Sequence, residues 1–575
     1  MGFLEYAQSL FFDKDWMKNK VLISQKYRFP QFRKNEEGSI CILPEPTPIE
    51  GEEKALSLMG YIFPIDPLGQ AQLASLFRAS VYYLSSLSLN ANFEDYLKWS
   101  RGKNQRLVNF ITSIIEGVKA INYISLKHQN KLLDLAIANT LALRRLGKMD
   151  GYVNPATKIM AGFLIKAYTG INPIQSKTER EVVENLFVLV QRFKEKAASS
   201  FAEKSRNLKE ERLKLADEIY QIIKDSGAIT ETPFLPHTQE LGHCSIFRPN
   251  LYVDFDVTLD EDFKKCLEFL GINHETFQDS NQKWRKIAEN EALQLIDTWK
   301  HQKEKDEKIL SQYQEILPLT KFKGVEIPEQ DYTEFLKIKA RCKSEAHRLI
   351  ESLLVARDAL DEDPRKLYGV LDLQEVIQVV AGRSPRTDVF MLDENISKSY
   401  SWIVLLDASE SMKSVSDFAM EIFLIMAEAA NELLLDPTSW ALYAFNDRFF
   451  VIKDLKERYN MRVKSRIGGV RFNGSTYIPD ALKVTGEVMK TRNDKLRLIT
   501  VISDGWPYGY QDIEAALTET VGTLKSRDIY PVGIGAKSTR IATYFKSHCS
   551  AFTLRDLTKQ FSRIFIEASN IAVET

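Results

Sequence analysis

The chain has 575 residues, of which 44% are hydrophobic and 27% charged, so it can bury more than one core. Its net charge of −1 weighs against binding to nucleic acids or anionic membranes through excess positive charge. No uninterrupted run of about 18 apolar residues marks a membrane-spanning helix. Residues 1–6 lack the pattern of a secretory signal, and the five cysteines are scattered as in reducing compartments. We therefore expect a soluble cytoplasmic protein without membrane insertion.

Most of the first 370 residues carry apolar side chains at the three- and four-residue spacing of amphipathic helices. Proline-containing breaks occur at 232–236 and 361–364, where helices are expected to stop. We therefore expect a helical N-terminal domain over 1–230 and a middle region over 231–370, helical with short strands and a linker. The clearest helical segments are 104–125, 131–145, 178–224, 281–314 and 332–360.

Four potential zinc ligands, His237, Glu240, His243 and Cys244, follow the first of these breaks. Zinc sites need four well-spaced ligands, or three and a water. The spacing matches neither His-Glu-x-x-His nor paired Cys-x-x-Cys, and the segment follows a proline-rich loop. We interpret it as a loop that leads into a short strand at 251–257, with a zinc site as the alternative.

Strand and helix patterns alternate in the C-terminal part of the chain. Two apolar runs that are typical of strands buried on both faces of a sheet end at Asp407 and near Asp504. Alternation of this kind predicts a parallel sheet with helices on both faces. The expected fold is thus a mainly α N-terminal region followed by an α/β, doubly wound, Rossmann-like domain over 371–575, with its core at 399–575. Further strands are expected at 439–445 and 529–534, and helices at 415–435, 478–489, 512–525 and 557–568.

Oxygen-bearing side chains gather where the two apolar strands end. Asp407, Ser409 and Ser411 form an Asp-x-Ser-x-Ser motif directly after the first strand. Thr476 stands at a loop-to-helix junction, and Asp504 ends the second strand. Because open α/β sheets bind ligands at the carboxyl ends of their strands, these side chains could reach one ion. Oxygen ligands suit a hard cation such as Mg²⁺, although serine and aspartate also serve as ordinary helix caps.

The segment from residue 399 onward resembles a von Willebrand factor A domain with a complete metal-ion-dependent adhesion site. The resemblance implies that the hydroxyls contact the ion, that the aspartates act partly through water, and that an Asp or Glu of a partner protein completes the coordination. The hydroxyl-rich set favours Mg²⁺ or Mn²⁺ over Ca²⁺. The five positions of the family's site match Asp407, Ser409, Ser411, Thr476 and Asp504.

A second resemblance begins at residue 372. A helical stretch at 372–377, then Gly-Arg-Ser-Pro at 382–385 and an extended approach to the first strand, is similar to the NorD and CbbO group. That group contains nitric oxide reductase activation proteins and adaptor subunits of a rubisco activase. The resemblance implies an adaptor that binds a client protein through the metal site and docks on a MoxR-type AAA+ ATPase through its helical part. The client is left open among nitric oxide reductase, rubisco and other enzymes.

Two features near the metal residues could contact a partner. Trp506 follows Asp504 closely and is either a cap of the core or an anchor in an interface. A basic run over 453–471 could steer an acidic protein surface toward the ion, although a solvated connection would explain it as well. The basic residues that we consider for partner binding are Arg462, Lys464, Arg466 and Arg471.

The sequence lacks the motifs of common enzyme classes. It has no phosphate-binding Gly-x-x-x-x-Gly-Lys-Ser/Thr loop, no dinucleotide-binding Gly-x-Gly-x-x-Gly turn after a strand, and no Gly-x-Ser-x-Gly elbow. No histidine lies near Ser409 and Ser411 in the sequence to activate them as nucleophiles. We therefore expect a non-enzymatic binding protein. The alternative is a Ro-type RNA-binding protein, but the chain is not basic and shows no aromatic stacking platform.

Overall fold

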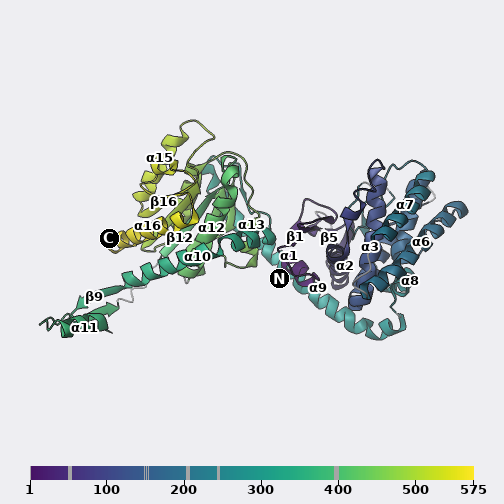
Figure 1. Cartoon of the computed structure of the whole chain (residues 1–575), viewed down its shortest axis with the longest axis horizontal. Helices are drawn as coiled ribbons and strands as arrows, with labels where there is room; N and C mark the ends of the chain where they lie inside the picture. Colours follow the sequence, from purple (N-terminus) through teal and green to yellow (C-terminus); the bar gives the residue numbers. More distant parts are fainter. Residues whose placement is uncertain are drawn as a thin grey trace. The chain divides into compact units, whose positions relative to one another are not determined.

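The computed structural model describes most of the chain as two compact units, Met1–Lys303 and Glu304–Thr575, which we call unit 1 and unit 2. Figure 1 draws the elements of both in sequence colours. The division differs from the three segments expected above, because the region 231–370 is shared between the units. The description leaves out residues 1, 50–54, 148, 150–151, 153, 203–207, 243–245, 273, 369, 394–399 and 575.

Unit 1 contains strands that the sequence analysis did not anticipate. In one sheet β3 (Gly38–Pro44) pairs in parallel with β1 (Asn19–Ser24) and antiparallel with β2 (Gln31–Asn35). Buried Cys41 follows exposed Ile40 in β3, as expected for a strand with one face in the core. Apart from α1 (Phe3–Leu10), the helices of unit 1 begin only after these strands. A second sheet consists of β4 (Thr47–Pro48), β5 (Ala55–Leu58), β6 (Tyr61–Pro64) and β7 (Leu251–Tyr252).

The helices of unit 1 share a hydrophobic core with both sheets. Its central helix, α2 (Pro67–Asn90), is buried along most of its length. The side chain of Asp66 accepts the backbone N–H of Gly69 at 2.6 Å, and Pro67 fits the first helical turn, so the start of α2 is fixed by its sequence. The other helices are α1 (Phe3–Leu10), α3 (Gln105–Lys127), α4 (Leu132–Arg145), α5 (Pro155–Thr169), α6 (Lys177–Ala202), α7 (Lys209–Asp225), α8 (Glu261–Leu270) and α9 (His274–Gln314), within which the division between the units falls.

Helix α3 is the one helix among the described residues that is long and apolar enough to cross a membrane. In the structure, 89% of its most apolar window is buried inside the protein. Its side chains pack in the core of unit 1, so its apolar character is accounted for by contacts with neighbouring helices.

A seven-stranded sheet forms the centre of unit 2 in the part of the chain that the structure describes. Its strand order is β17, β16, β15, β12, β13, β14, β8, and all neighbouring strands are parallel except β13 and β14. The chain adds β13 on one side of β12 and β15 on the other, so the winding direction reverses between β12 and β15. Ligands of open α/β sheets bind beside such a reversal. The strands are β8 (Val325–Glu326), β12 (Tyr400–Asp407), β13 (Trp440–Phe445), β14 (Phe449–Lys453), β15 (Leu496–Ser503), β16 (Ile529–Ala536) and β17 (Ser547–Ala551).

Helices cover both faces of this sheet. In β12, Trp402, Val404 and Leu406 belong to one core, whereas Ile403 and Leu405 belong to the other. This alternation is that of a strand buried on both faces. Each strand and helix predicted after residue 399 is present, and β14, β17 and α13 (Met461–Gly468) are additional. The first core contains side chains of α10 (Tyr332–Asp361), α12 (Ser416–Leu433) and α16 (Leu554–Glu574), and the second those of α14 (Ile478–Met489) and α15 (Ile513–Lys525).

Helix α10 belongs to unit 2, although the sequence analysis placed it before the C-terminal domain. Its Leu349 and Leu353 are buried in the core of unit 2, and its Lys339 pairs with Glu428 of α12 at 3.0 Å. Helical spacing predicts an apolar stripe but not the surface that the stripe covers. Beyond α10 the chain forms a small sheet beside a short helix (Figure 1). The strands of this sheet are β9 (Glu362–Lys366), β10 (Val370–Leu371) and β11 (Phe390–Asp393), and the helix is α11 (Leu373–Ala381).

We expect the fragment 304–575 to fold and the fragment 371–575 to fail. The shorter fragment lacks α10, so the apolar surface that Leu349 and Leu353 cover would be exposed to water. Thermal unfolding followed by circular dichroism, together with gel filtration, compares the two fragments with the full chain. A cooperative transition of equal midpoint in both fragments would contradict the assignment of α10 to unit 2.

Candidate metal centre

Asp407 ends β12 at the reversal point of the sheet and is fully buried. Its Oδ1 accepts the backbone N–H of Ser409 at 3.0 Å, and its Oδ2 accepts the hydroxyl of Ser503 at 2.6 Å. Ser503 is the last residue of β15, the neighbouring strand. The sequence analysis did not single out Ser503. Its place before Asp504 at the end of an apolar strand was the signal that could have identified it.

The two serines of the motif lie close together on the loop after β12. The Ser409 and Ser411 hydroxyl oxygens are 3.2 Å apart, with Ser409 buried and Ser411 exposed. The helix that follows, α12, is capped by Val415 without a side-chain hydrogen bond. Neither serine therefore serves as its N-cap, which was the ordinary structural explanation for the motif.

Backbone hydrogen bonds join the loops that carry the other predicted ligands. The N–H of Asn473 donates to the Ala408 carbonyl at 2.8 Å, and the N–H of Glu410 donates to the Gly474 carbonyl at 3.0 Å. Gly474 has a φ of +75°, and a Cβ there would lie 2.6 Å from Asp447 Oδ1, so this close approach requires glycine. The loop before α14 is thereby fixed against the loop after β12.

Thr476 and Asp504 lie on loops that are held together in the same way. Thr476 is buried, and its backbone exchanges two hydrogen bonds with Tyr508, at 2.9 and 3.3 Å. Asp504 is partly buried and accepts the N–H of Trp506 at 3.1 Å. The structure thus places the predicted ligands on three hydrogen-bonded loops at the carboxyl edge of the sheet.

The electrostatics of Asp407 disfavour its ionised form unless a positive charge lies beside it. Burial raises the pKa of its carboxyl from 3.8 to about 7, although Ser409 and Ser503 donate hydrogen bonds to it, and the nearby Asp504 raises the pKa further. No basic side chain among the described residues pairs with Asp407. A bound cation would compensate this buried charge.

The oxygen donors also fit a hard divalent cation. The set offers two carboxylates and three hydroxyls, which are ligand types of Mg²⁺ and Mn²⁺. Within the described ranges, no group of three or more His, Cys, Asp or Glu side chains could hold a metal ion. The proposed ligand set contains two carboxylates and three hydroxyls, so it does not form a group of that kind. The residues that could hold the ion are Asp407, Ser409, Ser411, Thr476 and Asp504.

Aromatic side chains lie beside the metal residues. Trp506 is 54% exposed and Tyr508 is 75% exposed, so neither ring caps the core. The guanidinium carbon of Arg540 lies 3.4 Å from the centroid of the Trp506 ring, which holds the indole through a cation–π contact. The structure therefore excludes the interpretation of Trp506 as a cap of the core.

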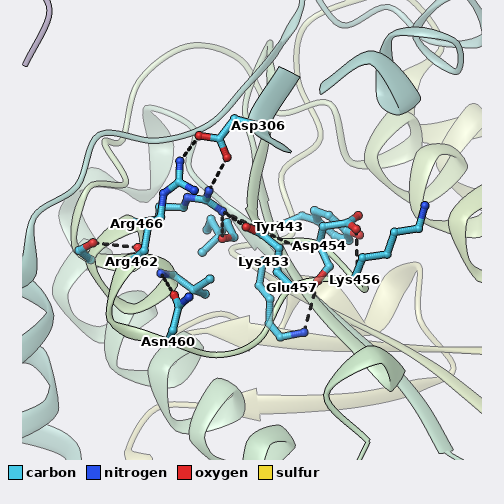
Figure 2. A network of polar contacts seen from close by, with 12 residues as sticks. Asp306, Tyr443, Lys453, Asp454, Lys456, Glu457, Asn460, Arg462 and Arg466 are labelled. Carbon is cyan, nitrogen blue, oxygen red and sulfur yellow. Dashed lines mark hydrogen bonds and ion pairs between the residues drawn. The ribbon is translucent and has the colours of Figure 1, made fainter. Parts of the chain in front are cut away.

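The basic run before Thr476 is largely an internal charge network, as Figure 2 shows. Arg466 is fully buried and pairs with Asp306 and Glu457, each at 2.9 Å. Arg462 is mostly buried and pairs with the same Asp306 carboxylate. Because Asp306 lies on α9, far away in the sequence, the spacing of basic residues could not reveal this pairing. The charges of Arg462 and Arg466, which we considered for steering a partner, are therefore neutralised within the protein.

The other predicted basic contacts have local partners as well. Lys464 places its ammonium 4.8 Å from the centroid of the Tyr459 ring. Arg471 pairs with Asp331 at 3.4 Å, although its side chain stays more than half exposed. Both keep exposed surface, but the run as a whole is not a free basic patch.

The predicted zinc segment is only partly described. His237 is fully buried, and burial lowers the pKa of its imidazole to about 3. Among the described residues, neither ring nitrogen has a hydrogen-bond partner. His243 and Cys244 lie outside the described residues. Glu240 accepts a hydrogen bond from Gln31, so its carboxylate is engaged within unit 1.

The chain was compared with protein families, curated sequences and solved structures. No family model matches the chain, and no curated protein sequence matches it. Among solved structures, the manganese-loaded TRAP protein of Plasmodium vivax matches at 16% identity and a TM-score of 0.23. The match covers 29% of this chain and 74% of that one. We draw no argument from a likeness of this size.

The metal-free chain should lose stability as the pH rises. A carboxyl with a pKa of 3.8 in the unfolded chain and about 7 in the folded chain binds more protons when folded between these values. The free energy of unfolding therefore falls from about pH 4 to about pH 7, by on the order of 4 kcal/mol. Above pH 7, Mg²⁺ should restore stability, because it stabilises the ionised carboxylate.

The variant Asp407→Asn isolates this effect, because its amide fills the same space and does not titrate. We expect it to be more stable than the wild type above pH 7 without metal, and insensitive to Mg²⁺. The matched control is Asp417→Asn, which removes an exposed carboxylate at the start of α12. Thermal melts across pH, with Mg²⁺ or EDTA, measure both. Equal Mg²⁺ responses in wild type and Asp407→Asn would refute the site.

We also expect Asp306→Ala to destabilise unit 2 by about 3 kcal/mol, because it leaves Arg462 and Arg466 short of a carboxylate inside the protein. The control Lys464→Ala should change the free energy of unfolding little. Urea titration followed by tryptophan fluorescence measures both variants. An unchanged midpoint for Asp306→Ala would show that the network does not hold α9 against α13.

Proposed function

We propose that the chain is a non-enzymatic adaptor whose C-terminal part is a von Willebrand factor A domain with a Mg²⁺- or Mn²⁺-dependent protein-binding site. The observation that carries the proposal is the buried Asp407 carboxylate, which has no basic partner among the described residues and sits at the reversal point of the sheet. Hydroxyl donors and a second carboxylate lie on the loops around it. A cation is the group that this arrangement lacks.

In the proposed site, this chain's residues hold the ion and leave it accessible. Asp407 supplies the buried charge, while the hydroxyls of Ser409, Ser411 and Thr476 add neutral oxygens. Few protein charges leave the bound ion able to attract a carboxylate of a partner protein, which is the chemistry that the ion supplies. Exposed Ser411 marks the side open to solvent. Trp506 and Tyr508 border the site and would contact apolar groups beside that carboxylate.

The partners follow from the resemblance to the NorD and CbbO group. We infer that a client protein offers an Asp or Glu to the ion, and that a MoxR-type AAA+ ATPase supplies the ATP hydrolysis. The absence of a phosphate-binding loop from the sequence supports a division of labour between this chain and a motor. Unit 1, with its large helical surface, would dock on the ATPase in the cytoplasm. The client would be an enzyme that needs activation or remodelling.

Affinity capture from native lysate tests this proposal. Wild type, Asp407→Asn and the control Asp417→Asn serve as baits, each with Mg²⁺ or with EDTA, and bound proteins are identified by mass spectrometry. We expect an AAA+ ATPase with wild type and control, and a client that is lost with Asp407→Asn and with EDTA. Co-purification of RNA and no ATPase would instead favour the Ro-type alternative and overturn the adaptor proposal.

A further inference from the structure

The short helix α11 carries an apolar stripe that faces solvent. Leu373, Ile377 and Val380 follow one another at the four- and three-residue spacing of a single helix face. They are 68%, 64% and 70% exposed. Leu367 and Tyr368, between β9 and β10, are exposed to a similar degree. Exposed apolar residues are ordinarily scattered, and a contiguous group of this kind marks a contact surface.

The opposite face of α11 already has its partners. Glu375 is buried there, and its carboxylate pairs with Arg365 at 3.1 Å and with Arg386 at 3.2 Å. Asp372 caps the start of the helix by accepting the N–H groups of Gln374 and Glu375. The inner face therefore fixes the helix on the small sheet, and the apolar stripe points away from it. Figure 1 shows α11 with β9 beyond the end of α10.

The charges around the stripe suit a second copy of the same helix in antiparallel orientation. The side chains next to the stripe, Gln374 and Gln378, are uncharged, so two copies can approach without repulsion. The helix begins with the negative Asp372, and the positive, exposed Arg383 follows its end. In an antiparallel pair, Asp372 of each copy faces Arg383 of the other.

We propose that two copies of this chain associate through α11, with the two helices antiparallel about a two-fold axis near Ile377. Leu373 of one copy then covers Val380 of the other, and the Asp372 and Arg383 charges close both ends. Such a pairing is isologous, as in most homodimers. This inference rests on α11 alone and does not depend on the metal site or on the proposed adaptor function.

The contact should be weak. A helix of nine residues buries less than the roughly 800 Å² per partner that stable interfaces bury. We therefore expect a reversible dimer that dissociates on dilution. A weak interface also explains how these residues can be exposed in the single chain without an obligate partner.

Sedimentation velocity of the full chain over about a hundredfold range of concentration tests the pairing. We expect a monomer at low and a dimer at high concentration. Ile377→Glu should weaken association at least about tenfold by placing like charges at the axis. Val355→Glu, at an exposed site on α10, is the matched control and should dimerise like wild type. Unchanged circular dichroism verifies folding of both. A wild type that stays monomeric throughout would overturn the proposal.

Cross-linking locates the axis. With dissolved oxygen as the oxidant, Ile377→Cys should form an intermolecular disulfide quickly, because the two Cβ atoms of residues at the axis can approach within bonding reach. Val355→Cys reports random encounters at an equally exposed position. Faster bond formation in Ile377→Cys supports the antiparallel pair. Equal rates for the two variants would contradict it.

Discussion

A buried carboxylate at the carboxyl end of the central strand imposes the main constraint on unit 2. Asp407 ends β12, beside the point between β12 and β15 where the winding direction of the sheet reverses. Its side chain is fully buried between the neighbouring strands. Hydrogen bonds from the Ser409 backbone and the Ser503 hydroxyl compensate its charge only in part, since its pKa stays near 7. Besides the Ser409 N–H, which donates to Asp407, backbone hydrogen bonds of the loops that meet above it join these loops to one another. They therefore form a rim of oxygen donors around a charge that an external cation can neutralise.

Elsewhere in unit 2, the buried charge of Arg466 is neutralised within the protein. Arg466 is as deeply buried as Asp407, but it has carboxylates from Asp306 and Glu457 within 3 Å, and its positive charge needs no ligand. The comparison separates a structural role from a binding role. The paired Arg466 stabilises the packing of the elements that it joins, whereas the unpaired Asp407 carboxylate at the end of a central strand is where the proposed cation would bind. By the same criterion, Arg462 and Arg466 have structural partners, while the proposed metal residues surround an unpaired carboxylate.

The sequence could predict what depends on local pattern. Apolar runs ending in Asp407 and near Asp504 located two adjacent strands and the edge at which a site would form, and the helices between them were visible from spacing. Contacts between distant segments were not predictable. The side on which α10 packs, the pairing of Asp306 with α13, and the Ser503 hydrogen bond all depend on residues that lie far apart in the chain. The short strand expected at 251–257 is present as β7, but the strands β1 to β6 were missed because they are short and lie next to long, strongly periodic helices.

The proposed metal residues and the α11 stripe lie on separate surfaces of unit 2, so a contact at one leaves the other accessible. Helix α10 spans 30 residues, or about 45 Å, between the core that it covers and the small sheet beside α11. A pair of chains joined through α11 would leave both metal edges free, because the stripe shares no residue with them. If the proposed function holds, two metal sites in one assembly would bind a partner with two acidic segments more tightly than either would alone, since the second contact forms at a high effective concentration. Weak pairing through α11 and weak coordination at each ion could thus combine into firm but reversible capture.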